Sequence, residues 1–235
     1  MQSLSIGGIT PLTSTDYPGH LSAVVFCQGC SWRCGYCHNA HLIPRKSETM
    51  VSWPWVRRFL ERRRGLLDAV VFSGGEPTLQ RGLHDAVMET RALGYKVALH
   101  TAGPYPSRLG KLLPFLDWVG MDIKADFENY DATTGAPGSG MKAMESAQML
   151  IGSGVDCEFR TTVHPALISK ERLLALAKTL SGIGAKNYVL QEFRPTGCAD
   201  AGLAAVNAAG YVDDEMCDLI RPMFETFAVR RGEGR

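Results

Sequence analysis

The sequence lacks several features that would place it in a specialised class of protein. Its 25 lysines and arginines almost balance its 24 aspartates and glutamates, so at a formal net charge of +1 no overall field draws it to nucleic acid or a membrane surface. No apolar run approaches the roughly 20 residues that a membrane-spanning helix needs. The first residues lack a basic stretch followed by a continuous apolar core, so we expect no signal peptide, a cytoplasmic location, and neither a nucleic-acid nor a membrane partner.

The sequence also lacks features that would indicate more than one domain. No internal repeat, low-complexity tract or linker interrupts the 235 residues. A chain of this length can bury about 70–75% of the surface that it exposes when unfolded. We therefore predict a single domain over residues 1–235, with an N-terminal extension over 1–20 and a C-terminal extension of helix and strand over about 195–235.

Two kinds of apolar pattern alternate along the chain. Short, almost continuous apolar runs predict strands, and longer stretches with apolar residues at helical spacing predict helices. We predict short extended pieces with turns over 3–18, strands over 21–27, 68–73, 96–101, 118–124, 156–164 and 187–193, a possible edge strand over 227–230, and helices over 53–64, 83–93, 108–113, 141–151, 170–180 and 213–224. Strands separated by helices form a parallel sheet. Six such units predict an α/β fold with a partial (β/α)6 barrel, since a full eight-unit barrel takes about 250 residues.

What the sequence does contain is a tight group of thiols. Cys27, Cys30, Cys34 and Cys37 fall within eleven residues of a chain with seven cysteines. This clustering, together with the odd total, favours a metal or iron–sulfur site over disulfides. Two Cys-x2-Cys pairs separated by only three residues are cramped for one zinc ion. Cys27 also continues an apolar strand and is equally well explained as a small buried hydrophobe, which leaves three thiols as ligands.

Other candidate functional groups share one position, the end of a predicted strand. The cysteines follow the first strand, and the others are Gly74-Gly75-Glu76-Pro77 after the second, His100-Thr101 at the third, and Asp122 with Lys124 at the fourth. In parallel βα folds these strand ends meet at one edge, where active sites lie. Glycines let a backbone approach closely, and a carboxylate suits a cation. A simple turn at 74–77 and a strand-end ion pair at 122 and 124 are the alternatives.

The Cys-x3-Cys-x2-Cys spacing, with these motifs in this order, resembles the radical S-adenosylmethionine (radical SAM) superfamily. The resemblance implies one 4Fe-4S cluster held by Cys30, Cys34 and Cys37, with S-adenosylmethionine on the iron that has no thiolate. An electron from the reduced cluster then cleaves this cofactor to methionine and a 5′-deoxyadenosyl radical, which abstracts a hydrogen atom. On this interpretation the chain is one radical SAM domain.

The family's pattern also implies cofactor contacts. These are Tyr36, Cys37 and His38 on the adenine side, Gly74, Gly75 and Glu76 at the ammonium group, Thr101, and Asp122, Ile123 and Lys124 at the ribose and methionyl portions. The sequence departs from the pattern in two places. His100 stands where related enzymes often have aspartate, which puts a monovalent cation site in doubt, and no histidine stands in the stretch 191–193, where some relatives have one.

A narrower resemblance concerns the segment before the cysteines. Asp16-Tyr17-Pro18-Gly19, followed by VVFCQGC and CHN, is similar to the opening of glycyl-radical activating enzymes, and most similar to the activating proteins of anaerobic ribonucleoside-triphosphate reductases. The partners implied are a glycyl-radical protein, namely an anaerobic ribonucleotide reductase, and an electron donor of flavodoxin or ferredoxin type. Asp16 would help to hold the substrate peptide; an Asx-type turn is its alternative. For the whole chain, a radical SAM enzyme acting on a small molecule and a non-catalytic zinc or redox-binding module stay open.

Some conspicuous residues receive no functional role. Arg160 points either to the barrel mouth or to its wall. The arginines at 57, 58, 62, 63 and 64 form a basic patch on a helix, for which a solvated face is favoured over a docking surface. Cys157, Cys198 and Cys217 are too widely spaced to predict a second cluster.

Overall fold

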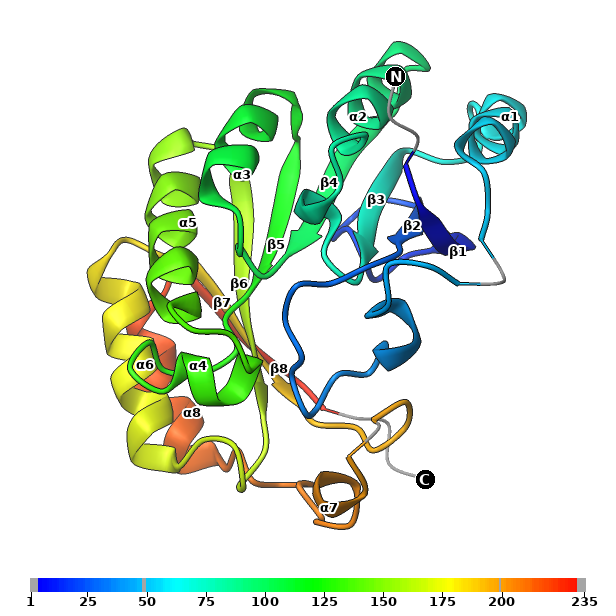
Figure 1. Ribbon diagram of the computed structural model, residues 1–235. Helices are drawn as coiled ribbons and strands as arrows, with labels where there is room; N and C mark the ends of the chain where they lie inside the picture. The colour runs from blue at the N-terminus through cyan, green and yellow to red at the C-terminus, as the bar shows by residue number, and fades with distance from the viewer. Residues whose placement is uncertain (1–3, 48–49, 199, 232–235) are drawn as a thin grey trace.

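Eight strands form one open sheet in the order β1 to β8, so that each strand pairs with its neighbours in the chain. The computed structural model describes residues 4–47, 50–198 and 200–231. The strands are β1 (Ile6–Thr13), β2 (Ser22–Cys27), β3 (Ala69–Gly74), β4 (Lys96–Thr101), β5 (Trp118–Asp122), β6 (Asp156–Val163), β7 (Asn187–Glu192) and β8 (Thr226–Arg230). All neighbouring pairs from β2 to β8 are parallel, and β1 is antiparallel to β2. The predicted α/β fold with a parallel sheet that does not close into a full barrel is confirmed (Figure 1).

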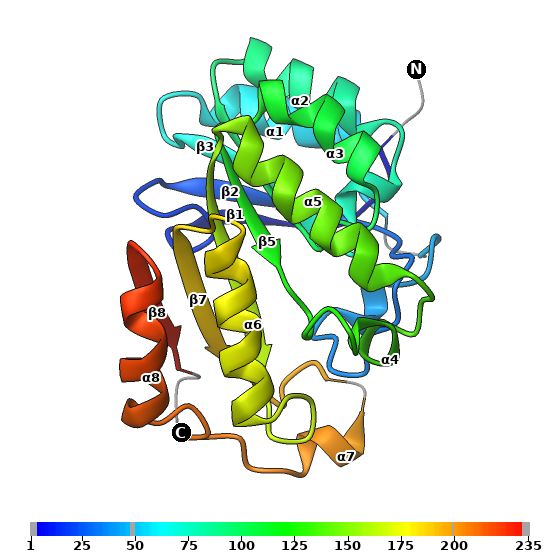
Figure 2. The same ribbon diagram turned by 90° about the vertical axis from the view of Figure 1, so that its left-hand side faces the viewer.

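Helices follow most of the parallel strands and cover one face of the sheet (Figures 1 and 2). They are α1 (Trp53–Arg63), α2 (Leu83–Ala92), α3 (Pro106–Leu112), α4 (Tyr130–Thr134), α5 (Ser139–Ser153), α6 (Lys170–Gly182), α7 (Ala201–Ala204) and α8 (Asp214–Ile220), with 3-10 turns η1 (Ala40–Leu42), η2 (Pro77–Leu79), η3 (Leu113–Phe115) and η4 (Arg221–Met223). The short helices α4 and α7 lie beyond the ends toward which the strand arrows point (Figure 2). No helix among the described residues is long and apolar enough to cross a membrane.

Side chains alternate between the two faces of each strand, and the two faces are packed differently. Outward residues such as Phe72, Leu99 and Met121 join Leu60 and Leu150 of the helices in the large core. The inner face has a smaller apolar cluster built from β2 to β5 and from Tyr17, which lies between β1 and β2. Full burial of such an apolar side chain stabilises the fold by about 1.5–3 kcal/mol.

Tyr17 closes part of the inner face. Its ring is buried and stacks on Trp118 with ring centroids 5.5 Å apart. The aromatic pair packs on Val24, Val71 and Ala98 of the three preceding strands. The segment before β2 is therefore held across the concave side of the sheet, toward the strands that carry the candidate site.

Two local expectations are corrected by the structure. The Gly-rich start is extended and followed by turns, as predicted, but it forms one eight-residue strand, β1, rather than several short pieces. A Cβ at Gly7 would lie 2.4 Å from Gln28 Oε1, so glycine permits this close strand contact. The helix predicted over 213–224 is α8 followed by the 3-10 turn η4, because Pro222 has no N–H to continue the helix.

The two terminal extensions contain regular structure. Residues 1–20 contribute β1, and those after 195 contribute α7, α8 and the edge strand β8. Residues 1–3, 199 and 232–235 of these extensions lie outside the described part of the chain. The division into one domain with two extensions remains a prediction.

Candidate cofactor site at the carboxyl ends of the strands

The cysteine loop, residues 28–39, follows β2 directly and is held by backbone hydrogen bonds on both flanks. Gly29 N and Cys30 N donate to the carbonyls of Leu42 and Ile43 over 2.7 and 3.1 Å. Arg33 N donates to Thr134 O at the end of α4 over 2.8 Å. The loop thus lies between its own return segment and a helix that follows β5, and its three cysteines are fixed beside the strand ends.

All seven cysteines are free thiols. Cys30, Cys34 and Cys37 are half-buried, whereas Cys27 is completely buried at the end of β2. Burial raises the pKa of Cys30 to about 12 and also raises the pKa of Cys34. Thiols in such surroundings stay protonated until a metal replaces the proton.

The donor set suits an iron–sulfur cluster. Among the described residues, no three His, Cys, Asp or Glu side chains come together closely enough to hold one metal ion. In a 4Fe-4S cluster each thiolate binds a separate iron, so the ligands need not meet around one metal ion. The finding therefore does not contradict the predicted cluster ligands. Cysteine thiolates bind such a cluster, and three free, partly exposed thiols lie on one short loop. These residues therefore fit an iron–sulfur cluster.

Two glycines bring the end of β3 against the cysteine loop. A Cβ at Gly75 would lie 2.4 Å from the carbonyl oxygen of Gly29, and Glu76 N donates to that same oxygen over 2.9 Å. Gly74 has φ +121°, and a Cβ there would lie 2.4 Å from Cys27 N. Larger residues would push the two backbones apart, so this glycine pair sets the distance between the loop and the carboxylate that follows.

Glu76 is buried, and its hydrogen-bond donors are all neutral. Oε1 accepts from Thr78 N, Thr78 Oγ1 and Thr101 Oγ1 over 3.0, 2.5 and 2.8 Å, and Oε2 accepts from Ala102 N over 3.0 Å. Burial raises the pKa of Glu76, and these hydrogen bonds offset only part of that effect. Such a carboxylate gains from any cation that reaches it.

Asp122, at the end of β5, has two cationic partners. Lys124 Nζ donates to Oδ2 over 2.9 Å, and Arg160 Nε donates to Oδ1 over 3.0 Å. Burial opposes ionisation of Asp122, but Lys124 and Arg160 outweigh it and hold the pKa of the carboxyl well below its usual range. The three groups together carry one excess positive charge on the inner face of the sheet.

Lys124 is held between two tyrosines. Its backbone N–H donates to the Tyr130 hydroxyl over 3.0 Å, and its backbone carbonyl accepts a long 3.4 Å hydrogen bond from the Tyr36 hydroxyl. The Lys124 ammonium lies 5.7 Å from the centre of the Tyr36 ring. The Tyr36 ring is buried, while the neighbouring His38 is anchored through Nε2 to the carbonyl of Arg194 at 2.8 Å. Tyr36, Cys37 and His38 thus lie on one stretch that reaches from β5 to the segment after β7.

Two predicted cofactor contacts have side chains turned toward other groups. Thr101 is buried and donates its hydroxyl hydrogen bond to Glu76. Ile123 has its side chain in the large core, on the opposite face from Asp122 and Lys124, so only its backbone reaches the inner face. Their predicted contacts remain predictions, with the Thr101 side chain acting through Glu76.

His100 and Asp16 are brought together from positions 84 residues apart. The His100 Nε2–H donates to the Asp16 carbonyl over 2.8 Å, and the Asp16 carboxylate accepts from Thr13 Oγ1 over 2.7 Å. Burial and the nearby Arg160 guanidinium lower the pKa of His100 to about 3. The neutral imidazole therefore joins the segment before β2 to the face that carries Asp122.

Sequence reasoning left Arg160 undecided and did not find Tyr130. Phe159 and Val163 pack in the large core, so alternation along β6 puts Arg160 on the inner face. A Cβ at Gly120 would lie 2.4 Å from the Arg160 guanidinium, and a glycine inside a strand is the signal that could have shown this close approach. Tyr130 stands on a five-residue helix, α4, which gives no periodic signal.

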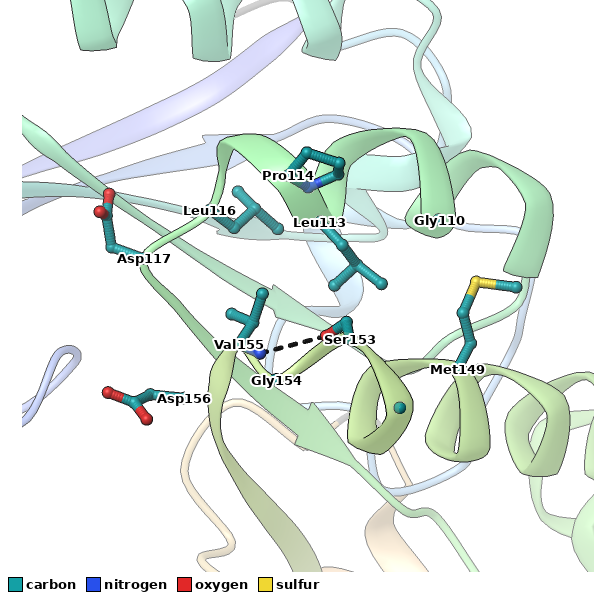
Figure 3. Close-up of a pocket in the computed structure, with 11 residues that line it drawn as sticks. Gly110, Leu113, Pro114, Leu116, Asp117, Met149, Ser153, Gly154, Val155 and Asp156 are labelled. Atoms are coloured by element: carbon teal, nitrogen blue, oxygen red, sulfur yellow. Dashed lines mark hydrogen bonds between the residues drawn. The ribbon is translucent and has the colours of Figure 1, made fainter.

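A hollow of about 830 Å³ lies at the other ends of the strands. It lies between α3 and α5, with the carboxylates of Asp117 and Asp156 near the starts of β5 and β6 (Figure 3). In βα folds residues at this face contribute to stability and those at the carboxyl ends to function. The hollow is therefore separate from the cysteine loop.

Comparison with known proteins gives a consistent result. A sequence profile of the radical SAM superfamily matches residues 24–180. A Methanocaldococcus jannaschii protein named "Putative glycyl-radical enzyme activating enzyme" is 30% identical over 218 residues, which cover 83% of this chain and 82% of that protein. A pyruvate formate-lyase-activating enzyme of Clostridium pasteurianum is 32% identical over 189 residues, 76% of each chain.

Among solved structures, Streptococcus suis SuiB bound to S-adenosylmethionine superposes with a TM-score of 0.67 at 14% identity. The match covers 87% of this chain and 48% of SuiB, so the chain spans about half of that protein's length. At this identity the likeness concerns the fold. The profile match covers well over half of the 235 residues, and the chain belongs to the radical SAM superfamily.

Proposed function

We propose that the protein is a radical SAM activase, which generates a glycyl radical on an anaerobic ribonucleoside-triphosphate reductase. Relatives whose names describe activation of glycyl-radical enzymes cover most of the chain at 30% and 32% identity. The observation that supports the proposal is the packing of the cysteine loop against Gly74 and Gly75, which brings Cys30 close enough to the buried carboxylate of Glu76 for their charges to interact.

Cys30, Cys34 and Cys37 would hold the cluster. The cluster and S-adenosylmethionine, when bound, supply hydrogen-atom abstraction by a carbon-centred radical. Glu76 has only neutral donors, so it suits the ammonium group of the cofactor. The excess positive charge of Lys124 and Arg160 over Asp122 suits the cofactor's carboxylate.

The substrate side of the site would be formed by the segment that Tyr17 packs onto the inner face. Asp16 is half-buried, and its backbone is fixed by His100 and its side chain by Thr13. A fixed carboxylate at an open sheet face can accept hydrogen bonds from the N–H groups of an extended peptide. This supports a protein substrate that presents a glycine loop, with Asp16 as a peptide contact.

The test is an anaerobic reconstitution followed by two assays. The protein should bind about four irons and four sulfides per chain and form 5′-deoxyadenosine with dithionite as reductant. It should also produce a glycyl-radical signal in electron paramagnetic resonance when mixed with the anaerobic reductase of the same organism. Full cleavage activity in Cys30→Ala would show that the ligand assignment is wrong.

The same assays separate the competing functions. Cleavage of the cofactor without a glycyl signal on any glycyl-radical protein of the organism would favour a small-molecule substrate. A colourless anaerobic preparation with one zinc per chain would establish a zinc-binding module and contradict the proposed chemistry.

A further inference from the structure

Exposed cations flank each of the three cysteines of the loop. Arg33 lies between Cys30 and Cys34 and is exposed. Arg45 and Lys46 lie on the return segment, where the Cα of Arg45 is 3.6 Å from the Cβ position of Gly29, next to Cys30. Arg194 is exposed on the segment after β7, where its carbonyl is bound by His38, next to Cys37. We call Arg33, Arg45, Lys46 and Arg194 the basic rim.

The basic rim is not neutralised within the described part of the chain. None of its four side chains has a hydrogen bond or ion pair with another described residue. The exposed carboxylate of Asp200 also lies against the loop; its Oδ1 caps α7 and its Oδ2 is 3.6 Å from the Cβ position of Gly35. Among the exposed side chains of the described residues, the four cations of the rim against Asp200 leave a local excess of about +3, in a chain whose net charge is only +1.

Elsewhere on the described surface some cations are paired, and others, such as Arg58 and Arg62 on α1, are not. Arg57 lies within ion-pair distance of Glu61 and Glu89, and Arg91 pairs with Asp117 over 2.8 Å. Unpaired charges of one sign that surround a redox site attract a partner of the opposite sign and raise its rate of encounter. The partner that must reach a one-electron centre at these half-buried thiols is an electron carrier, and an acidic one matches the rim.

We propose that the basic rim is the docking surface for a small acidic one-electron carrier of flavodoxin or ferredoxin type. This inference rests on the proposed function, which requires a reduced cluster. In the complex the carrier is oxidised by one electron and the cluster is reduced by one. No bond forms or breaks, and no proton is transferred.

The test compares two double variants with the same change of charge. Arg45→Glu with Lys46→Glu alters the rim, and Arg58→Glu with Arg62→Glu alters two exposed arginines on α1, which lies far from α7 in Figure 1. The first readout is binding of oxidised bacterial flavodoxin to the holoprotein, measured by anaerobic isothermal titration at low ionic strength. Arg33→Glu is a third, independent rim variant.

We expect the Kd for flavodoxin to rise about tenfold or more in each rim variant and to stay within twofold in the α1 variant. The affinity of the unaltered protein should fall steeply with salt, because the contact is between exposed charges. Equal weakening in the α1 variant, an unchanged Kd in the rim variants, or no measurable binding by the unaltered protein at low salt would overturn the proposal.

A second readout separates this proposal from the proposed function. With reduced flavodoxin the rim variants should form 5′-deoxyadenosine about tenfold more slowly than the unaltered protein, and with dithionite all variants should match it. Slowing by the same factor with both reductants would overturn the docking role. If dithionite drives no cleavage in the unaltered protein, the proposed function fails, and the binding comparison still decides the docking surface.

Discussion

Glu76 is a buried carboxylate and Asp122 a half-buried one, both at the ends of parallel strands, yet their surroundings shift the two pKa values in opposite directions. Glu76 has only hydroxyl and backbone donors, and its pKa is raised. Asp122 lies between Lys124 and Arg160, and its pKa is lowered. The same type of residue therefore carries a charge that is costly at one position and strongly favoured at the other.

The difference shows which of the two carboxylates stabilises the fold and which one is suited to bind a ligand. Asp122 balances two cations that would otherwise be buried together, so the folded chain depends on it. Glu76 has no cation among the described residues to balance it, so its charge stabilises a complex with a positive ligand more than it stabilises the fold. Substitutions at the two positions should separate stability from binding.

The largest effect is expected for Asp122→Asn. The amide keeps the shape of the side chain but leaves Lys124 and Arg160 without their counter-charge. Loss of one partner from a buried ion pair costs about 3–5 kcal/mol. Because a third of the Asp122 side chain is exposed, we expect the free energy of unfolding of the apoprotein to fall by about 3 kcal/mol, measured by urea denaturation.

The matched control is Glu61→Gln, which removes a carboxylate from the exposed Arg57–Glu61 pair on α1. Exposed pairs contribute little to stability, so its urea midpoint should not move measurably. If Asp122→Asn destabilises the protein no more than Glu61→Gln does, the ion-pair account of Asp122 is wrong.

The next effect is expected for Glu76→Gln and concerns binding. A hydrogen bond to a charged group contributes about 1.5–3 kcal/mol, so the Kd of the reconstituted protein for S-adenosylmethionine should rise roughly ten- to hundredfold. Its stability should change far less than in Asp122→Asn, because a charge that is costly to bury is removed. Anaerobic titration calorimetry gives the Kd, and a value within twofold of the unaltered protein would contradict the ammonium contact.

Lowering the pH should change the contributions of Asp122 and Glu76 to stability in opposite directions. Asp122 holds fewer protons when folded, so its contribution is present above pH 4 and is lost as the pH falls toward its lowered pKa. Glu76 holds more protons when folded, so its contribution improves as the pH falls through its raised pKa toward the unfolded value of 4.5.

Between pH 5 and pH 3 the unfolding free energy of Asp122→Asn should therefore fall less than that of the unaltered protein, by about 1 kcal/mol, since one pKa unit corresponds to 1.36 kcal/mol. Between pH 7 and pH 4.5 the unfolding free energy of Glu76→Gln should fall more, or rise less, than that of the unaltered protein. Urea midpoints at three pH values measure these changes. Parallel curves for the two variants would contradict the opposite shifts.

The smallest effect is expected for His100→Gln, beside Asp122. The unfolded imidazole takes a proton near pH 6.5, whereas the folded one stays neutral down to about pH 3, so the unaltered protein loses stability as the pH falls below 6.5. Glutamine keeps an N–H donor for the Asp16 carbonyl but does not titrate. The unfolding free energy of His100→Gln should fall less between pH 6.5 and 5 than that of the unaltered protein. His100→Ala also removes the hydrogen bond, so its unfolding free energy at pH 7 should be about 1 kcal/mol lower.

Much of the fold was predictable because the parallel strands are buried on both faces. The predicted strand over 96–101 matches β4, and the other five central strands are predicted to within two residues at each end. The failures have local causes. Gly7 and Gly8 obscure the strand pattern of β1, and α4 and α7 are shorter than two helical turns.

For the site, the sequence could identify groups but not their partners. Placement at the strand ends followed from the parallel sheet, so Glu76 and Asp122 were found together with the cysteines. That Thr101 donates to Glu76, or that His100 holds Asp16, depends on contacts across 25 and 84 residues that no local pattern contains. The cluster ligands and the cofactor contacts themselves remain predictions.

The strand order has a consequence for how the protein is made. Because β2 to β8 are added to the sheet in chain order, each strand can pair with an edge that has already left the ribosome. The cysteine loop, Glu76 and Asp122 all emerge before β6 supplies Arg160 and well before α7 reaches the loop. The thiols are therefore synthesised early and covered late, because α7 is among the last elements of the chain to be made.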